Sequence, residues 1–511
     1  MTSSNTSLPR NRSRKPNRLF IEVIGRYDWL FEKLVDFGEK HGTACHYIIV
    51  PSLSLKYKYQ SLLKHKDSMV ITIAELDAEL EGIQFPVEYD IIEAAAQLEI
   101  SFGYRYLRDL MQQDRSVWAT KVPFAAPTWG NVGDVDDISV YDRINRGFIF
   151  LESVFKKFQP KMLLVRPGSV LTNIAISIAE KNSVPCTMPR PARHNSFVTW
   201  TLGPYSHSAQ LKNLFDDDAI DVPTVLIDDI NAPDGSMQVF ARFQNSYGFR
   251  GLLRRFLIET YNHAHSLCRA ISRGNVNSRA RYLIFLNRFS LEIRSIEFLR
   301  KIWVNDAKSL PGKKLLFLLP KEPEYTVQSL GRDFNNIHAM LAHLSTSLPV
   351  GVTLLIKEHS RVGYRKLEFY KELTRYSNVK FVNPFLPSKH FLKDCDAAAT
   401  VAGTIALECC AEGKKCLTFT DKMEYNFLPN VVYAHNLYKL CGIVDVLLEK
   451  PKASDIAIYK KAASRYYAIL ERTSFSAPGT KVFEGTDSIS DASLKRAWEL
   501  LCLNYQYQLD N

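Results

Sequence analysis

Hydrophobic and polar positions along this chain alternate between two periods. Residues 19–25 form an apolar run that ends in glycine, residues 27–42 carry apolar positions at helical spacing, and residues 44–51 form a second apolar run. Short apolar runs predict buried strands, whereas a period near 3.6 predicts an amphipathic helix. Strand, helix and strand in this order predict a βαβ unit with parallel strands, which helices cover on both faces.

The same alternation continues through the first half of the chain. Helical spacing runs without an obvious break over residues 89–115 and returns over residues 141–159. An apolar strand is expected at 160–168, a helix after Ser169 as its N-cap, and another strand at 184–189. This half is therefore predicted to be an α/β domain.

The pattern changes twice more. Residues 237–303 are mostly helical in spacing and rich in Arg, Tyr and His, which indicates a helical connector. From Lys313 onward, short apolar strands again alternate with helices, which predicts a second doubly wound domain. The expected fold class is α/β and GT-B-like: two Rossmann-like domains facing each other across a cleft. The predicted divisions are a disordered basic arm (1–18), an acceptor domain (19–235), the connector (236–303), a nucleotide-sugar-binding domain (304–485) and a C-terminal helix (486–511).

Composition fits a large folded protein and a negatively charged partner. The 511 residues carry a formal net charge of +11, and the nine cysteines show no zinc-ligand spacing. A basic balance suits nucleic acid, an acidic membrane face or a phosphorylated substrate. No nucleic-acid-binding motif is present, so no nucleic-acid partner is expected. Without a signal peptide or a bilayer-spanning run, we expect a cytoplasmic protein whose basic patches suit peripheral contact with the inner membrane face.

Chemistry is first suggested by residues 400–419, where a strand is followed by a Gly-Thr turn and a short helix. Gly403 lets the backbone approach a ligand closely, and Thr404 is placed to cap the helix, whose N-terminus favours an anion. Glu408 lies one turn later on the same face, where a carboxylate can accept both hydroxyls of a ribose. The plain alternative is a capped helix with a solvated glutamate.

Two further stretches follow strands of the same predicted domain. Lys357 and His359 point to one side of a strand end, where a cation and an imidazole can meet phosphate oxygens. Glu324 belongs to a proline-punctuated loop after another strand and is a candidate donor contact. A solvated strand end and a rigid turn are the respective alternatives.

Together these stretches resemble the bacterial capsule polysaccharide biosynthesis family, the GT-B-type glycosyltransferases that include the capsule Kdo transferases. The resemblance is carried over about residues 315–427 by Pro323-Glu324, by Lys357-Glu358-His359, and by Gly403-Thr404 with Glu408, Gly413 and Lys414. It is fainter in the N-terminal half. Three positions depart from the family pattern at donor-side sites: Pro320, Glu322 and Ser360.

The resemblance implies transfer of a sugar from a nucleotide-activated donor to a capsule or lipopolysaccharide-type glycan or glycolipid, with no cofactor and no metal. The donor would be held by Glu324, Lys357, His359, Gly403, Thr404 and Glu408, and His359 would also act in catalysis. An inverting transfer needs a base, for which Glu99 and Asp114 are the candidates. Two other functions stay open: a nucleotide-sugar epimerase of similar architecture, and a non-catalytic scaffold of a polysaccharide assembly complex.

Overall fold

The computed structural model divides the chain into two compact units, neither of which is a continuous stretch. The first unit contains Met1–Leu107, Asp137–Ile220 and Ile469–Asn511, and the second contains Arg108–Asp136 and Asp221–Ala468. The C-terminal helix thus belongs with the first unit and the helical connector with the second. The structure describes residues 15–23, 28–42, 45–103, 107–118, 121–124, 136–191, 197–203, 209–217, 245, 247–271, 277–322, 326–331, 334–359, 362, 365–423, 425–477 and 489–510. The predicted disordered arm lies almost entirely outside them.

The first unit is built on a parallel sheet with strand order β3-β2-β1-β4-β5. Its strands are β1 (Arg18–Glu22), β2 (Cys45–Val50), β3 (Met69–Thr72), β4 (Met162–Leu164) and β5 (Cys186–Thr187). Ile21 in β1 is in register with Ile48 on one side and Leu164 on the other. The order reverses between β1 and β4, as in a Rossmann fold.

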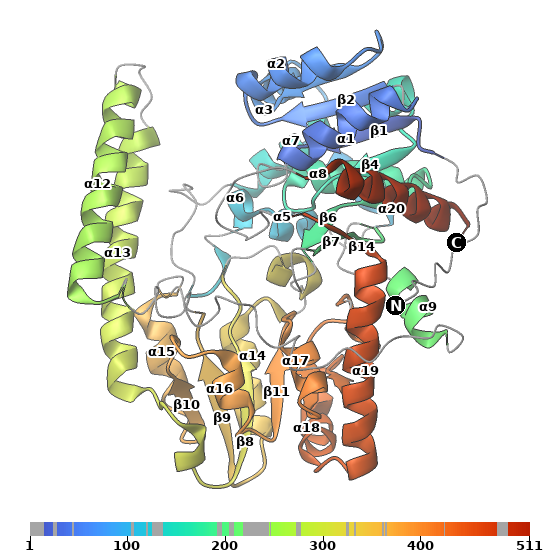
Figure 1. Ribbon diagram of the computed structural model, residues 1–511. Helices are drawn as coiled ribbons and strands as arrows, with labels where there is room; N and C mark the ends of the chain where they lie inside the picture. Colours follow the sequence, from blue (N-terminus) through green and yellow to red (C-terminus); the bar gives the residue numbers. More distant parts are fainter. Residues whose placement is uncertain are drawn as a thin grey trace. The chain divides into compact units, whose positions relative to one another are not determined.

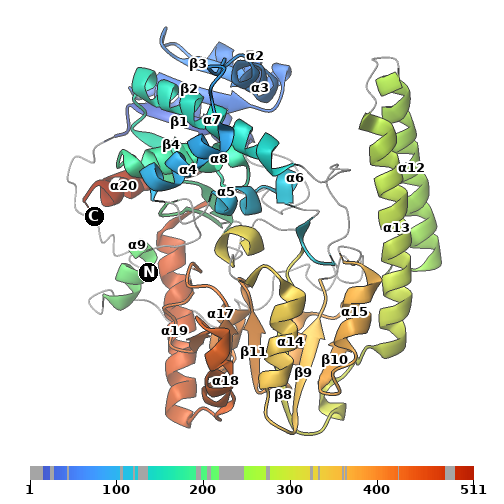
Figure 2. The ribbon, with the colours of Figure 1, turned by 180° about the vertical axis from the view of Figure 1, so that it is seen from behind.

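Helices cover both faces of this sheet. On one face, alternate strand residues pack against α1 (Asp28–Lys40) and α20 (Asp491–Asp510), which face the viewer in Figure 1. On the other face, Phe20 and Tyr47 contact aromatic rings of α7 (Asp137–Phe158), seen in front in Figure 2. The remaining helices of the unit are α2 (Leu53–Leu62), α3 (Ile73–Glu81), α4 (Ile91–Phe102), α8 (Val170–Lys181) and α9 (Ala209–Asp216).

Ser169 accepts a hydrogen bond from the Thr172 backbone amide at 3.1 Å and caps α8, so this prediction is confirmed. The single long helix expected over residues 89–115 is wrong. α4 ends at Gly103, which has φ 67°, a left-handed conformation that glycine adopts without strain. The chain then forms two short helices, α5 (Arg108–Gln113) and α6 (Arg115–Trp118).

A small antiparallel sheet that the sequence patterns did not reveal joins distant segments of the first unit. Its order is β14-β7-β6, from Ser474–Ser476, Phe197–Trp200 and Pro189–Pro191. Its middle strand is also tied to α20, because the Trp200 indole donates to the Ala497 carbonyl at 2.9 Å. These pairings explain why the C-terminus belongs to this unit.

The second unit contains a six-stranded parallel sheet of order β10-β9-β8-β11-β12-β13. The strands are β8 (Lys313–Leu318), β9 (Val352–Lys357), β10 (Val379–Val382), β11 (Ala397–Thr400), β12 (Lys415–Thr418) and β13 (Val431–Tyr433). This is again the Rossmann order, with its reversal between β8 and β11. Two Rossmann-like units of the predicted α/β class are therefore confirmed.

Alternation along the strands divides the core of the second unit into two layers. Leu315 and Phe317 pack with α14 (Ile337–Ser347), α15 (Leu367–Leu373) and α18 (Leu440–Leu448) on one face. The helices α16 (Ser388–Leu392) and α17 (Ile405–Ala411) lie in front of the sheet in Figure 1, whereas α14 and α15 lie in front in Figure 2. The unit also contains most of α19 (Ala453–Arg472), with three short helical segments at Ala307–Ser309, Thr326–Leu330 and Leu437–Lys439.

The predicted helical connector is a hairpin of two long helices, α12 (Phe249–Ile271) and α13 (Asn277–Ile302). They lie side by side in both views (Figures 1 and 2). The C-terminal part of α13 enters the core of the second unit through Ile296 and Leu299. No helix in the described part of the chain is long and apolar enough to cross a bilayer.

Candidate functional site at the carboxyl edge of the second sheet

The carboxyl ends of β8, β9, β10 and β11 bring most of the predicted donor residues to one edge of the second sheet. In open α/β sheets this edge carries the ligand site, at the point where strand order reverses. Here the reversal lies between the loop after β8, which contains Glu322, and the turn after β11, which contains Gly403 and Thr404. Lys357 is the last residue of the neighbouring strand β9.

Lys357 is a buried cation, with only 6% of its surface exposed. Its ammonium donates to the Pro384 carbonyl, which follows β10, at 3.2 Å. Burial lowers the pKa of Lys357 to about 8, although the nearby carboxylates of Glu358 and Glu408 favour its charged form. At neutral pH the site therefore still holds an ammonium group, and this charge is sensitive to small increases in pH.

Glu408 supplies the carboxylate of the site from α17. Its Oε2 accepts a hydrogen bond from the Ser388 hydroxyl, at the start of α16, at 3.1 Å. The side chain is half-buried, and its charge acts on Lys357. The structure thus brings together Lys357 and Glu408, which are separated by 51 residues in the sequence (408 − 357).

The turn before α17 differs in detail from the sequence expectation. Thr404 occupies the N-cap position, but its backbone is already helical and its side chain makes no capping hydrogen bond. The predicted side-chain cap is therefore wrong. A Cβ at Gly403 would lie 2.5 Å from the Thr400 hydroxyl oxygen, so glycine is needed here for close packing against the end of β11.

Beside Lys357 lies a buried ion cluster formed by Arg365, Glu322, Glu358 and Tyr370. Arg365 is fully buried and donates through Nε to Glu322 at 2.7 Å and through one terminal nitrogen to both Glu358 oxygens at 2.8 and 3.0 Å. The Tyr370 hydroxyl donates to Glu358 at 2.7 Å. Such a guanidinium supplies the positive charge that two buried carboxylates need.

The ion cluster has strongly perturbed protonation. Burial raises the pKa of Glu322 to about 7, although Arg365 partly opposes this increase. Burial also raises the pKa of Tyr370 well above its ordinary value. Burial by itself would lower the pKa of Arg365, but the two glutamates and Tyr370 together outweigh this effect and raise it. Among the described residues, Glu322 Oε1 has no hydrogen-bond partner.

Sequence reasoning missed Arg365 entirely. The signal that was available is the pair of acidic residues Glu322 and Glu358 beside buried strands, because two buried carboxylates require a cation. The departure from the family pattern at Glu322 thereby acquires a structural reason, since this glutamate pairs with Arg365.

The remaining predicted donor residues are placed as follows. His359 is half-buried directly after β9, and its backbone amide donates to Glu358 Oε1 at 2.7 Å. Glu324 lies outside the described residues, as does Ser360. The Lys414 ammonium donates to the carbonyls of Leu392, Lys393 and Cys395 at 2.6–2.8 Å, so its contacts close the end of α16.

The two candidate bases belong to different units. Glu99 lies on α4 in the first unit and accepts a hydrogen bond from the Leu107 backbone amide at 2.6 Å, which stabilises the chain after this helix. Asp114 lies between α5 and α6 in the second unit, and 9% of its surface is exposed. Its carbonyl accepts the amides of Val117 and Trp118. Their roles as bases stay predictions.

The first sheet has its own group of polar side chains where its strand order reverses. Glu22 ends β1 and accepts a hydrogen bond from the Thr172 hydroxyl, on α8, at 2.5 Å. The Ser169 and Thr172 hydroxyls lie 2.7 Å apart. This edge thus combines one carboxylate with two hydroxyls, and the half-buried Arg166 follows β4 at the same edge.

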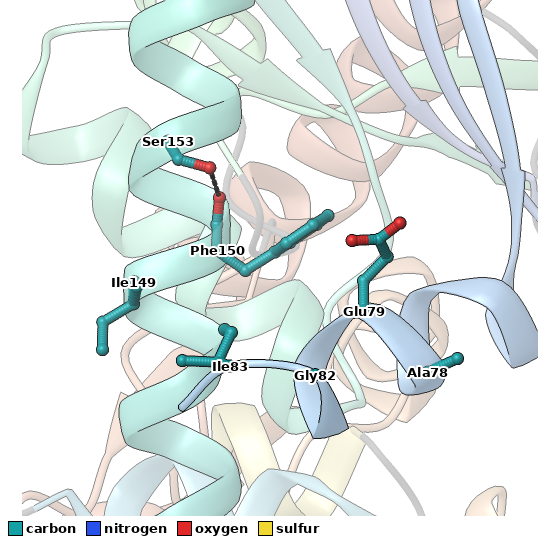
Figure 3. Close-up of a pocket in the computed structure, with 7 residues that line it drawn as sticks. All are labelled: Ala78, Glu79, Gly82, Ile83, Ile149, Phe150 and Ser153. Atoms are coloured by element: carbon teal, nitrogen blue, oxygen red, sulfur yellow. Dashed lines mark hydrogen bonds between the residues drawn. The ribbon is translucent and has the colours of Figure 1, made fainter. Parts of the chain in front are cut away.

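A separate hollow of about 450 Å³ lies between α3 and α7 of the first unit (Figure 3). Ala78, Glu79, Gly82, Ile83, Ile149, Phe150 and Ser153 line it. Of the described residues that line it, only Glu79 is ionisable, and the Ser153 hydroxyl donates a hydrogen bond to the Phe150 carbonyl at 2.6 Å. None of the predicted site residues that the structure describes lines this hollow.

No protein-family model and no curated protein matches the sequence. Several solved structures of nucleotide-sugar enzymes are similar over long stretches at low identity. The UDP-GlcNAc 2-epimerase of Methanocaldococcus jannaschii is 15% identical, with a TM-score of 0.25, and the match covers 89% of this chain and 99% of that one. The corresponding epimerase of Neisseria meningitidis is 12% identical, with a TM-score of 0.26, over 89% and 98% of the two chains.

The β-Kdo 2,4-transferase KpsC of Thermosulfurimonas dismutans is also similar. It is 12% identical, with a TM-score of 0.29, and the match covers 60% of this chain and 79% of that one. Scores of this size do not distinguish a transferase from an epimerase. The chemistry of the site must therefore be argued from its own residues.

Proposed function

We propose that this protein is a glycosyltransferase of the GT-B type that moves a sugar from a nucleotide-activated donor to a bacterial surface glycan of the capsule or lipopolysaccharide type. The observation that carries the proposal is that a buried ammonium, Lys357, and a half-buried carboxylate, Glu408, whose charge acts on it, both lie at the reversal edge of the second sheet. A nucleotide diphosphate or monophosphate presents oxygens to the first group and ribose hydroxyls to the second.

In this proposal Lys357 neutralises the charge that develops on the departing nucleotide. A preorganised cation in a buried site stabilises such charge more strongly than it would in water. The backbone amides at Gly403 and Thr404 approach phosphate oxygens, and Glu408 accepts the ribose hydroxyls. His359 and Glu324 complete the donor contacts, and His359 donates a hydrogen bond to the leaving group.

The acceptor is a glycan or glycolipid, and its hydroxyl must lose a proton during an inverting transfer. Glu99 or Asp114 would accept that proton. The protein would work in the cytoplasm, in peripheral contact with the inner face of the membrane where the glycolipid is assembled. The basic composition of the chain supports this location.

Calorimetric titration with CDP-, CMP-, UDP- and GDP-linked sugars tests the donor site. One nucleotide class is expected to bind, and Lys357→Met is expected to weaken that binding by roughly 10- to 100-fold, the usual effect of losing a hydrogen bond to a charged group. Lys380→Met is the matched control, because Lys380 is an exposed lysine on the neighbouring strand β10.

Product analysis then separates the enzyme classes. A transferase releases free nucleotide only when acceptor is present, whereas an epimerase converts the sugar nucleotide without acceptor. Binding of no nucleotide by the wild-type protein would instead favour a non-catalytic scaffold. Equal nucleotide affinities of the wild type and Lys357→Met would show that the donor does not bind at the proposed site in the second sheet.

A further inference from the structure

Within the described part of the second unit, the N-terminal half of α12 makes its packing contacts on one side. Leu252 contacts the core of the second unit, and Phe256 lies against Phe289 of α13 with ring centroids 5.3 Å apart. Arg255 donates to both carboxylate oxygens of Glu292 on α13, at 3.0 and 3.1 Å. These contacts define the side of α12 that faces the protein.

The opposite side of α12 is apolar although it faces solvent. Leu253, Leu257, Ile258 and Tyr261 are exposed by 48%, 58%, 48% and 70%. At about 100° per residue, these positions fall within one continuous face that spans roughly 140° of the helix surface. A helix at the surface of a soluble protein normally shows the reverse arrangement, with polar residues outward. We therefore expect a binding partner to cover this apolar face of α12.

Charge on the same face indicates what the occupant is. Arg250 and Arg254 are exposed, and they share the face with Leu253 and Leu257. Neither arginine forms an ion pair with another described residue, in contrast to Arg255, which Glu292 neutralises. A surface that combines large apolar side chains with unneutralised arginines matches the boundary between lipid headgroups and acyl chains in an anionic membrane.

We propose that this face of α12, formed by Arg250, Leu253, Arg254, Leu257, Ile258 and Tyr261, binds the surface of an anionic lipid bilayer. The helix lies in the plane of the interface, with its apolar side chains among the upper acyl chains and its arginines on headgroup phosphates. Tyr261 lies at headgroup level, where amphipathic rings are favoured. The inference deepens the part of the proposed function that places the acceptor in a membrane.

Vesicle sedimentation tests this proposal with the full-length protein and no nucleotide. Wild-type protein is expected to bind phosphatidylcholine vesicles that contain phosphatidylglycerol, and to bind less in high salt or without the anionic lipid. The double variant Leu257→Asp/Ile258→Asp is expected to lose at least about tenfold in vesicle affinity, because two large apolar side chains no longer enter the bilayer. Arg250→Gln/Arg254→Gln is expected to lose about fivefold per arginine.

Two matched controls lie on other surfaces of the second unit. Tyr438→Asp changes a fully exposed apolar side chain, and Lys380→Gln removes an exposed cation; both are expected to bind vesicles like the wild type. Circular dichroism confirms that each variant is folded. Absence of wild-type binding to anionic vesicles, or equal binding by both α12 variants, would overturn the proposal.

A change from dimer to monomer in the α12 variants, with vesicle binding intact, would also overturn it and assign the face to contact between copies of this chain. The donor titrations provide the independent readout. If no nucleotide binds to any of these proteins but only the α12 variants lose vesicle affinity, the proposed transferase function fails and the membrane face stands.

Discussion

The two sheets share a strand order, yet the polar groups at their reversal points differ in charge. At the first sheet, Glu22 meets the hydroxyls of Thr172 and Ser169. At the second, Lys357 and Arg365 lie buried, and Arg365 is held by two buried carboxylates. Topology therefore fixes where polar side chains gather, whereas the residues themselves decide which ligand charge the edge favours.

The difference has an energetic consequence. Buried charges lose hydration, and this loss is offset only when every partner is present. In the hydroxyl–carboxylate group of the first sheet, Thr172 is buried, but the carboxylate of Glu22 and the hydroxyl of Ser169 belong to half-buried residues. Substitutions at the second edge should therefore have larger effects on stability than those at the first.

The largest effect is expected from Arg365→Met. Removing the guanidinium leaves Glu322 and Glu358 buried without their cation, which should lower the free energy of unfolding by about 3–5 kcal/mol. Urea denaturation measures this change. Arg375→Met is the control, because the Arg375 side chain is 75% exposed and should change the free energy of unfolding by less than about 1 kcal/mol. Similar losses in both variants would mean that the ion cluster does not stabilise the fold.

Lys357→Met should instead increase the free energy of unfolding. Because burial lowers the pKa of Lys357 from 10.5 to about 8, the unfolded chain holds its proton more tightly than the folded one. The variant should therefore be more stable by about 1–3 kcal/mol at pH 7 while losing nucleotide affinity. Thermal unfolding in parallel with calorimetric titration measures both quantities.

The pH dependence of Lys357→Met sharpens this result. Between pH 8 and 10.5 the unfolded wild type binds more protons than the folded state, so the Lys357 contribution should increase wild-type stability as pH rises. The variant should lack this increase. Nucleotide affinity of the wild type should fall over the same range, as the ammonium is lost. If Lys357→Met is instead less stable than the wild type, the contacts of Lys357 stabilise the fold by more than its burial costs, which would contradict this expectation.

Glu322→Gln should produce a moderate, pH-dependent effect. The folded pKa of Glu322 is raised from 4.5 to about 7, so the folded state binds more protons in this range. The contribution of Glu322 to stability is therefore complete below pH 4.5 and is lost as pH rises to about 7, which amounts to roughly 3 kcal/mol. Glutamine keeps an acceptor for Arg365 and should remove this slope. Parallel stability–pH curves of the two proteins would contradict the expectation.

The smallest effect is expected at the first sheet. Thr172→Val removes the hydrogen bond to Glu22 and should lower the free energy of unfolding by about 1 kcal/mol, without changing nucleotide affinity. Thr346→Val is the control, because Thr346 is exposed and the contacts that the structure describes for its hydroxyl are with carbonyls of its own helix, α14. A loss of nucleotide affinity in Thr172→Val would show that the edge of the first sheet also contributes to nucleotide binding, contrary to this expectation.

Periodicity predicted the elements of both sheets well, because burial of one strand or helix face leaves a local pattern. Ser169 was predicted as a cap and is one. Where local signals competed, the prediction failed: helical spacing continued past Gly103, but the left-handed glycine ends α4. Thr404 has the right residue type for a cap, yet its helical backbone leaves the hydroxyl out of that role.

The sequence by itself determined the α/β class, most strands and helices of the two sheets, the strand end that carries Lys357 and the helix that carries Glu408. Only the tertiary structure decided that Arg365 joins Glu322 to Glu358, that the C-terminal helix belongs to the first unit, and that the apolar face of α12 is turned to solvent. The physical reason is the separation along the sequence between the residues that interact. Secondary structure follows from residues three or four positions apart, whereas ion pairing and burial depend on partners that the folded chain brings together from distant positions.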